Sequence, residues 1–401
     1  MHAARHTSRG VYTMFWTLTI CSFMYILLVS RGIPTAEEPQ FGCFEQDQAE
    51  ALQRFGHKVV VVCVDSRFRM RWRKIGVTHE NKNGVDYYNS FWMPGAITDL
   101  LGKTFSRFIK KLQLDRIYKK IEKVYGKPDL IYSHYLFNSF LALSLKKKYN
   151  IPIVAIEHWS EVNKDTLKSD VRFMGDCVYQ NVNKVIAVSN SLRLMLKHHF
   201  NVDSEIVHNI VGHGFGYKSI AKNKEYFNFV SVGSLLYVKG YDILIEAFAK
   251  IANKINAKLS IVGAGNQYNY LMELIRKYNL QNQVSLLGRK NRTEIASILA
   301  CSDVYVSSSR SENFSVSVLE ALSVGLPVVA TICGGIKECI NDDNGILVPI
   351  ENPSELSNAM LQIYNNIHLY NREYIANDFE DRFSTNTIIG KLENIFKSVF
   401  E

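Results

Sequence analysis

The stretch Asp303-Val-Tyr-Val-Ser-Ser-Ser-Arg-Ser-Glu-Asn-Phe-Ser-Val-Ser-Val-Leu-Glu-Ala-Leu-Ser-Val-Gly-Leu-Pro-Val-Val-Ala330 decides the fold class of this 401-residue chain. Residues 303–309 alternate apolar and polar side chains before a run of serines, which predicts a strand that ends in a loop. Residues 314–324 have apolar side chains at helical spacing, and Gly325 and Pro327 end that helix before a strand at 328–331. The stretch therefore predicts a strand, a helix and a strand in succession, as in an α/β protein.

Two glutamates flank the start of the predicted helix. Glu312 lies in the loop after the first strand, and Glu320 lies on the helix, about 8 Å beyond Ser315 at a rise of roughly 1.5 Å per residue. The first turn of a helix has unpaired backbone N–H groups and the positive end of the helix dipole, so it suits an anion. Carboxylates on both sides of such a turn suit a ligand made of a sugar, a diphosphate and a nucleoside.

The spacing of these glutamates, followed by Ala, Gly and Pro, resembles the motif of the family 4 retaining glycosyltransferases (glycosyl transferases group 1), which have the GT-B fold. The resemblance covers most of residues 24–400, and it implies an α/β fold with two Rossmann-like, doubly wound parallel-sheet domains that face a central cleft. Four further blocks resemble the family in the expected order: Phe229–Gly240, Leu259–Gly265, Val284–Gly288 and Ile298–Val306.

We expect four parts along the chain. Residues 1–23 form an extension outside the core, and residues 24–213 form an amino-terminal, acceptor-binding Rossmann-like domain. Residues 214–380 form the nucleotide-sugar domain, after a linker near 211–224. Residues 381–401 contain a helix that packs back towards the amino-terminal domain. For the extension, a disordered or loosely packed leader competes with a signal peptide or membrane anchor, because polar residues interrupt its apolar run.

Two histidines follow predicted strands of the amino-terminal domain. The strand at 129–135 ends near His134, and the strand at 151–160 ends near His158. Ligands of open α/β sheets bind beyond the carboxyl ends of the strands, so both histidines are candidates for the site. By resemblance, His158 corresponds to a family histidine that contacts the donor sugar. Gly42, in the loop after the first strand, is either a residue that lets an acceptor sugar approach the backbone or an ordinary turn glycine.

The resemblance also assigns roles in the cleft. Glu312 lies by the transferred sugar and forms the catalytic group with His158 and Lys239, whose ammonium stabilises the departing diphosphate. Glu320 holds the ribose hydroxyls. No Asp-x-Asp motif is present, so neither a metal nor a cofactor is implied; the nucleotide-sugar is a substrate. The other expected site residues are Ser234, Asn313, Phe314 and Ser315 on the donor side, and Gly42 and His134 on the acceptor side.

The chain departs from the family pattern at two places. Ser234 stands where many members have an arginine beside the diphosphate, which puts the phosphate affinity in doubt. Asn313-Phe-Ser315 stands where glycines are common, which leaves the donor sugar open.

The net charge of +9 lies in one half of the chain. Residues 1–215 contain 29 Lys and Arg against 19 Asp and Glu, whereas residues 216–401 contain 18 against 19. No nucleic-acid motif accompanies the excess, so an anionic membrane surface or a phosphate-bearing lipid is the better partner. The seven cysteines form no Cys-x-x-Cys pair, as in a reduced, cytosolic protein.

Two stretches carry the basic excess, at residues 67–74 and 103–125. In the second, Phe105, Phe108, Ile109 and Leu112 recur at helical spacing between Lys103, Arg107, Lys110 and Lys111. Such a pattern is typical either of a helix in a membrane interface or of a surface helix whose apolar stripe packs on the sheet.

The sequence thus predicts a metal-independent, retaining hexosyltransferase. It moves a sugar from a UDP- or GDP-sugar to a growing glycan, lipid-linked in our interpretation, during cell-surface polysaccharide biosynthesis at the cytoplasmic face of the membrane. A catalytically silent scaffold of the same fold and a nucleotide-sugar epimerase are the alternatives.

Overall fold

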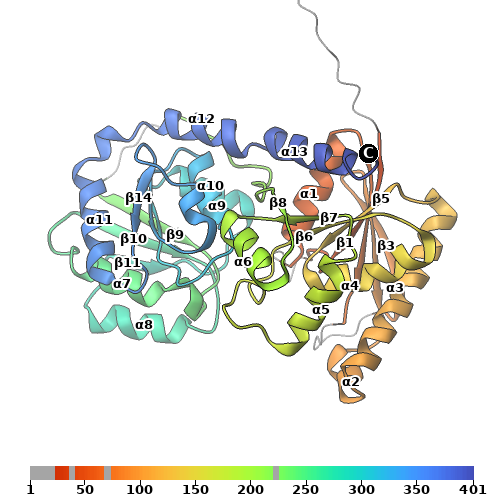
Figure 1. Ribbon diagram of the computed structural model, residues 1–401. Coiled ribbons are helices and arrows are strands. Elements are labelled where there is room, and N and C mark those ends of the chain that lie inside the picture. Colours follow the sequence, from red (N-terminus) through yellow and green to blue (C-terminus); the bar gives the residue numbers. More distant parts are fainter. Residues whose placement is uncertain (1–22, 36–40, 67–73, 220–224) are drawn as a thin grey trace, which may run out of the picture.

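Two α/β domains lie side by side and two carboxyl-terminal helices run along both of them (Figure 1). A computed structural model describes residues 23–35, 41–66, 74–219 and 225–401. Three expected features lie partly outside the described residues: the extension at 1–23 apart from Phe23, most of the basic stretch at 67–74, and part of the linker at 211–224. The two-domain arrangement that the resemblance predicts is therefore present.

The amino-terminal domain is built on one sheet. Among the described residues, its eight strands have the order β3-β4-β2-β1-β5-β6-β7-β8. The strands are β1 (Tyr25–Ser30), β2 (Lys58–Val64), β3 (Gly76–Lys82), β4 (Val85–Phe91), β5 (Leu130–His134), β6 (Ile153–Glu157), β7 (Lys184–Ala187) and β8 (Glu205–Ile206). The helices are α1 (Cys43–Arg54), α2 (Gly95–Leu100), α3 (Lys103–Tyr125), α4 (Leu136–Tyr149), α5 (Ser169–Tyr179) and α6 (Asn190–Phe200).

Helices cover both faces of this sheet, so its central strands are apolar on both sides. In β1, Ile26 and Leu28 join the core cluster that contains α1, whereas Leu27 and Val29 join the cluster that contains α3. Because successive side chains of a strand point to opposite faces, a continuous apolar run is what such a strand requires.

One edge of the sheet differs from the expected all-parallel arrangement. β3 pairs with β4 in antiparallel register, with Lys82 opposite Val85. The two residues between them, Asn83 and Gly84, both have positive φ angles, at 53° and 80°. Asn-Gly is the preferred pair for a two-residue hairpin turn with this backbone, which explains the antiparallel edge.

The carboxyl-terminal domain contains a smaller parallel sheet. Its described strands have the order β11-β10-β9-β12-β13-β14. The strands are β9 (Phe227–Val232), β10 (Ala257–Val262), β11 (Val284–Leu286), β12 (Val304–Ser307), β13 (Val328–Thr331) and β14 (Gly345–Val348). The helices of this domain are α7 (Tyr241–Ala249), α8 (Tyr268–Lys277), α9 (Arg292–Ala300), α10 (Val316–Ser323) and α11 (Pro353–Asn365).

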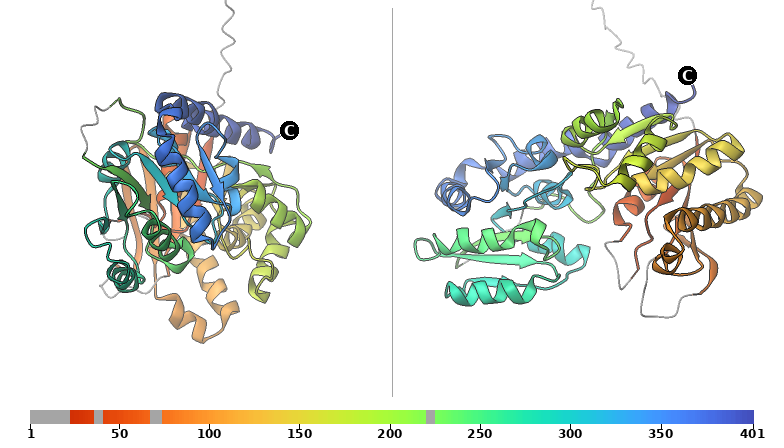
Figure 2. Two further views of the ribbon diagram at one scale, coloured as in Figure 1. Left: turned by 90° about the vertical axis from the view of Figure 1, so that its left-hand side faces the viewer. Right: turned by 60° about the horizontal axis from the view of Figure 1, so that its bottom comes forward.

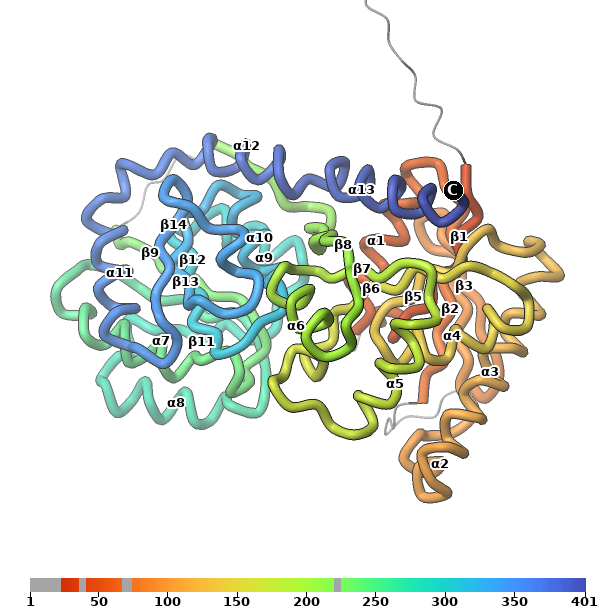
Figure 3. The backbone as a smooth tube through the Cα atoms, viewed as in Figure 1, coloured from red at the N-terminus to blue at the C-terminus, as the bar shows by residue number. Residues whose placement is uncertain are grey.

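The last two helices join the domains. The helix expected within residues 381–401 corresponds to α13 (Thr385–Lys397), and a further helix, α12 (Arg372–Phe383), precedes it, with Ser384 between them as the cap of α13. The tube in Figure 3 shows α12 over the carboxyl-terminal domain and α13 over the amino-terminal one. There His57 Nε2 lies 2.9 Å from Glu393 Oε1, and the Phe396 ring packs on Tyr132.

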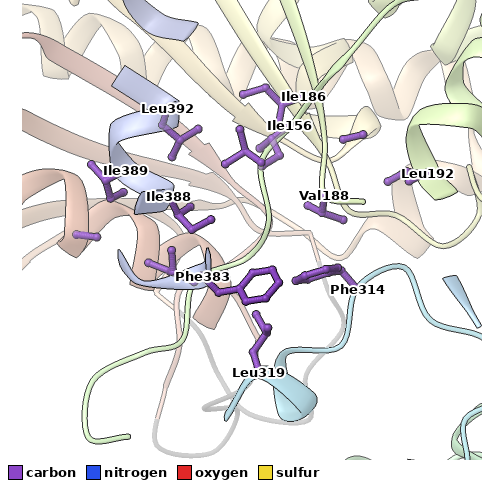
Figure 4. Close-up of a cluster of buried hydrophobic side chains, with 14 of the residues drawn as sticks. Ile156, Ile186, Val188, Leu192, Phe314, Leu319, Phe383, Ile388, Ile389 and Leu392 are labelled. Carbon is purple, nitrogen blue, oxygen red and sulfur yellow. The ribbon is translucent and has the colours of Figure 1, made fainter. Parts of the chain in front are cut away.

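A shared apolar core lies where the domains meet. Figure 4 shows Phe314, from the loop before α10, and Phe383, from the end of α12, facing each other. The same cluster contains side chains of β6, β7, α10 and α13, which belong to both domains. The two domains remain side by side in the right-hand view of Figure 2, whereas the left-hand view looks along the line that joins them.

The basic helix predicted at 103–125 is α3, with the same bounds. Its buried side chains lie mainly in its second half, whereas its first turns expose Phe105, Phe108 and Leu112. The apolar stripe of the first half therefore does not pack on the sheet. Within the described residues, no helix is long and apolar enough to span a membrane.

Candidate active site

Lys239 and Glu312 form an ion pair at the carboxyl ends of two neighbouring strands. Lys239 lies in the loop after β9 and Glu312 in the loop after β12, and Lys239 Nζ is 2.5 Å from Glu312 Oε1. Ser309 Oγ donates to the same carboxylate oxygen at 2.9 Å. Both charged side chains are partly exposed, at 24% and 13%. The sequence analysis assigned Lys239 to the diphosphate and Glu312 to the transferred sugar, and in the structure the two side chains contact each other directly.

The backbone around Lys239 is fixed by a close approach of the two loops. Gly240 has a φ of 63°, and a Cβ on it would lie 2.1 Å from the Ser308 carbonyl oxygen. Ser308 Oγ in turn donates to the Lys239 carbonyl at 3.1 Å. A side chain at residue 240 would push these loops apart, so the glycine holds the ammonium near Glu312.

Arg310 holds the same loop in place through hydrogen bonds, and the sequence analysis did not identify this residue. Its guanidinium donates to both carboxylate oxygens of Asp242, at 2.9 and 2.7 Å, and to the Tyr237 carbonyl at 2.7 Å. It also stacks on the Tyr237 ring and bonds Glu351. The position of Arg310, two residues before Glu312, was the available signal. It holds the turn that carries Lys239 rather than facing the pair itself.

The start of α10 offers backbone donors, as predicted, but not all of the predicted side chains. Within the described part of the chain, no hydrogen bond is formed by the backbone N–H groups of residues 313–315. Asn313 Nδ2 donates to the His158 carbonyl of the other domain at 2.6 Å. The Phe314 side chain is buried and stacks on His208 at 4.4 Å, so it belongs to the core between the domains. Ser315 is a buried residue at the helix cap.

Glu320 lies on α10, half-buried, and burial raises its pKa to about 8. Arg292 opposes this rise in the pKa of Glu320, and Asp47 adds to it. Desolvation disfavours the charged form of this carboxylate, so hydrogen bonds donated by hydroxyl groups would stabilise that form. Ser234, the expected donor-side residue after β9, is half-buried in its loop, where its carbonyl accepts from the Leu236 N–H at 2.8 Å.

The two histidines stack on one another, and only one lies at the cleft. His158 Nε2 is 3.2 Å from His134 Nδ1, and the rings are nearly parallel. His134 is completely buried and packs against His158, so its acceptor-side role stays a prediction. Burial and the neighbouring Arg31 lower the pKa of His158 to about 3. The imidazole is therefore neutral and can bond a hydroxyl group.

Glu157 is a supporting residue that the sequence analysis did not single out. Its buried carboxylate accepts from the backbone N–H groups of His158, at 2.9 Å, and Trp159, at 2.7 Å, and from the Tyr179 hydroxyl at 2.7 Å. These bonds fix the turn that presents His158.

Gly42 is required by the protein's own packing. Its φ is 86°, and a Cβ on it would lie 2.2 Å from the Gly32 carbonyl oxygen. The glycine lets the loop after β1 fold back on itself before α1 begins, which favours the turn-glycine alternative.

An ion pair across the domains was also missed. Arg292, the first residue of α9, donates to Asp47 of α1 with both Nη atoms, at 2.8 and 2.7 Å. Asp47 is buried, and Gly212 of the linker packs directly on the Arg292 guanidinium. Sequence spacing gives no signal for a pair of residues that are 245 positions apart.

Two family models match consecutive parts of the chain. The model of Glycosyltransferase Family 4 matches residues 46–213, and that of Glycosyl transferases group 1 matches residues 217–377. The chain belongs to the family 4 glycosyltransferases. An uncharacterized glycosyltransferase of Methanocaldococcus jannaschii is 32% identical over 246 residues, which are 60% of this chain and 67% of that protein.

Other relatives of this glycosyltransferase span more of its length. The putative teichuronic acid biosynthesis glycosyltransferase TuaC of Bacillus subtilis is 24% identical over 400 residues, 92% of this chain and 96% of that protein. Among solved structures, Anabaena HepE in complex with UDP has a TM-score of 0.70 at 19% identity, covering 94% of this chain and all of that one. The likeness shows the GT-B fold that the sequence predicted.

The arrangement joins one cation, a set of free backbone donors and a neutral imidazole around one junction between the domains. Such a site can bind a diphosphate and a sugar hydroxyl at once. Among the described residues, no group of three His, Cys, Asp or Glu side chains could hold a metal ion.

Proposed function

We propose that this chain is a retaining hexosyltransferase that moves a sugar from a UDP- or GDP-sugar to a growing, lipid-linked glycan in cell-surface polysaccharide biosynthesis. The ion pair of Lys239 and Glu312 beside the free N–H groups at the start of α10 is the observation that carries the proposal. Across the junction, Asn313 ties this loop to the strand end that bears His158. Donor-binding and acceptor-binding domains thus meet at one point.

Each of these residues has a separate role in the proposed reaction. The bond between the anomeric carbon and the diphosphate breaks while the acceptor hydroxyl bonds to that carbon, and the hydroxyl proton passes to the departing phosphate. Lys239 then leaves Glu312 for the diphosphate, whose negative charge grows as the bond breaks, so this contact is stronger in the transition state. Glu312 lies by the transferred sugar, and Glu320 accepts hydrogen bonds from the ribose hydroxyls.

His158 acts by positioning in this proposal. Because its pKa is lowered to about 3, it carries no charge near neutral pH and neither repels Lys239 nor needs an anionic partner. A neutral imidazole can bond a hydroxyl of the donor sugar. The reaction uses no metal and no cofactor in this account.

Product analysis tests the proposed reaction. The nucleotide-sugar is incubated with the enzyme and a membrane extract that supplies the acceptor, and the new linkage is examined by NMR. We expect the anomeric configuration of the donor to be kept. Inversion would contradict the retaining mechanism, and a changed sugar without any acceptor would show an epimerase.

An exposed apolar surface of the amino-terminal domain supports the proposed lipid-linked acceptor. α2 and the first turns of α3 stand away from the sheet, at the side opposite α12 and α13 (Figure 1). We call the exposed apolar residues there the α2–α3 surface. Its members are Ile97, Leu100, Leu101, Phe105, Phe108 and Leu112.

The exposed fractions show that this surface has no partner within the described chain. Leu100 is 84% exposed and Leu101 is 69% exposed, and Lys103 beside them is also largely exposed, although its Nζ lies 3.6 Å from Asp170 Oδ2. Arg107 bonds Asp170, and Lys111 lies over the Phe140 ring, so both of these cations also pack within the domain. An apolar patch with exposed cations fits an anionic lipid surface.

A vesicle assay tests this membrane contact. The variant Leu100→Ser/Leu101→Ser should bind phosphatidylglycerol vesicles more weakly than the wild type, and wild-type binding should fall with salt, because screening acts over about 10 Å at 0.1 M. Leu369→Ser, at a residue 70% exposed on the other domain, is the matched control. Equal binding of all three proteins would refute the contact, and with it the cytoplasmic membrane face as the place of action.

A further inference from the structure

Arg31 follows β1 and points its guanidinium between two aromatic rings. The guanidinium carbon lies 4.9 Å from the centre of the Phe41 ring and 4.6 Å from that of Tyr135. Phe41 packs closely on Gly32, where a Cβ would meet its ring at 2.0 Å. The loop after β1 and the end of β5 therefore hold this cation in one place.

Buried polar atoms without hydrogen-bond partners occur on Arg31, on its neighbour Glu45, and on other residues of α1 and β5. Within the described residues they include Arg31 Nε, Glu45 Oε2, Gln48 Nε2 and His134 Nε2. Glu45, Gln48 and His134 are completely buried. Buried polar groups in folded proteins are nearly always hydrogen-bonded, and leaving one without a partner is destabilising. Such unpaired atoms indicate a place for a polar ligand.

The charge of Arg31 is only partly compensated. Glu45 Oε1 accepts from the Arg31 backbone N–H at 3.2 Å and lies 3.6 Å from Nε. Burial raises the pKa of Glu45, and Arg31 lowers it. Asp47, the next acid along α1, is bonded to Arg292. Among the described residues nothing accepts from the two Nη groups, and 26% of the side chain is exposed.

The exposed part of the Arg31 side chain lies on the acceptor side of the proposed reaction centre. The Tyr135 ring beneath it also packs on His158, with 5.1 Å between ring centres. Tyr135 has a φ of 69°, a value that a side chain of this size rarely adopts and that is retained where the surroundings enforce it. The contacts of Tyr135 with Arg31 and with His158 therefore link this cation to the histidine at the reaction centre.

We propose that Arg31 binds an oxyanion, a phosphate or a carboxylate, carried by the acceptor close to the hydroxyl that receives the sugar. The proposal rests on the transferase function above and names the acceptor class: a hydroxyl compound with an anionic group. A guanidinium suits such groups because its planar fork can give two parallel hydrogen bonds to one oxyanion.

Calorimetric titration of the UDP-saturated protein tests the site, since UDP fills the donor side. The probes are glycerol 3-phosphate, malate and, as a neutral control, glycerol. We expect the wild type to bind at least one of the two anions and not glycerol, and the two arms show whether phosphate or carboxylate is preferred. Arg31→Gln should weaken that binding about tenfold or more, because a hydrogen bond to a charged group is lost. Arg31→Lys should fall between.

Two further variants separate ligand binding from a purely structural role. Arg54→Gln removes an exposed cation from the far end of α1 and should bind the anion as the wild type does. Glu45→Gln removes the acid that competes for Arg31 and should bind the anion at least as tightly. If Arg31→Gln and Glu45→Gln weaken binding alike, Arg31 only packs against Glu45 and the proposal is wrong.

The remaining outcomes are equally decisive. Failure of the wild type to bind either anion, or equal binding of glycerol, overturns the proposal. If Arg31→Gln lowers UDP affinity as much as anion affinity, Arg31 belongs to the donor site and the acceptor assignment fails. If the wild type binds neither UDP nor GDP, the transferase function fails separately, and the same titrations on the free protein still decide whether Arg31 binds an anion.

Discussion

Replacing Lys239 by alanine should abolish most of the turnover and leave the fold intact. The ammonium is the cation that the two donor-side loops hold at their contact, 2.5 Å from Glu312. Removing one preorganised charge-stabilising group typically raises the barrier by about 2.7–4 kcal/mol, which is roughly a hundredfold to a thousandfold in rate. We therefore expect a loss of at least tenfold, because Ser309 and the start of α10 remain.

The stability should change far less than the rate. Both partners of the pair are partly exposed, and ion pairs of this kind contribute about 0–1 kcal/mol. Release of nucleoside diphosphate is measured for Lys239→Ala, Glu312→Gln and the double variant, each with its melting temperature. Because the two residues touch, the double variant should lose less than the product of the single losses. Near-normal turnover in a well-folded double variant would refute the site.

Three more perturbations have defined outcomes. Glu320→Gln should mainly raise the KM for the donor, and it should remove a pH dependence of that KM. The pKa of Glu320 in the wild type is raised to about 8, so its carboxyl group is protonated below that pH. The KM of the wild type for the donor should therefore fall as the pH rises from about 7 to 9. A KM that does not change with pH in the wild type would contradict this role. Arg292→Gln leaves the buried Asp47 carboxylate unpaired and should lower the free energy of unfolding in urea by about 1–3 kcal/mol. The double variant Asp47→Asn/Arg292→Gln should lower it less. Equal decreases in the two variants would show that the residues are not coupled. Arg310→Gln should lower turnover without changing vesicle binding, because it loosens the turn before Lys239. Unchanged turnover would show that the hydrogen bonds of Arg310 to this turn are not needed for activity.

Local sequence signals predicted the elements that carry the donor side. The strand at 328–331 has the predicted bounds, and α10 begins two residues after its expected start, because Gly325 and Pro327 mark its end and the apolar spacing marks its length. The Asn83-Gly84 pair would have predicted the antiparallel edge by the same kind of signal.

Contacts between distant parts of the chain could not be predicted in this way. Whether the ring of Phe314 faces a donor or His208 depends on how the domains meet. His134 and His158 occupy equivalent places after neighbouring strands, and only the packing shows that one covers the other. The pair of Asp47 and Arg292 likewise exists only in the assembled fold.

Binding of the nucleotide-sugar tests the central claim most directly. Thermal unfolding is followed with UDP-, GDP- and ADP-sugars for the wild type and for Lys239→Ala and Glu320→Ala. A ligand at 100 times its Kd should stabilise the wild type by about 2.7 kcal/mol. We predict that a UDP- or GDP-sugar raises the melting temperature of the wild type, that Glu320→Ala loses most of this shift, and that Lys239→Ala loses a smaller part of it. If none of these nucleotide-sugars stabilises the wild type, or if both variants respond as it does, the account of the donor site is wrong.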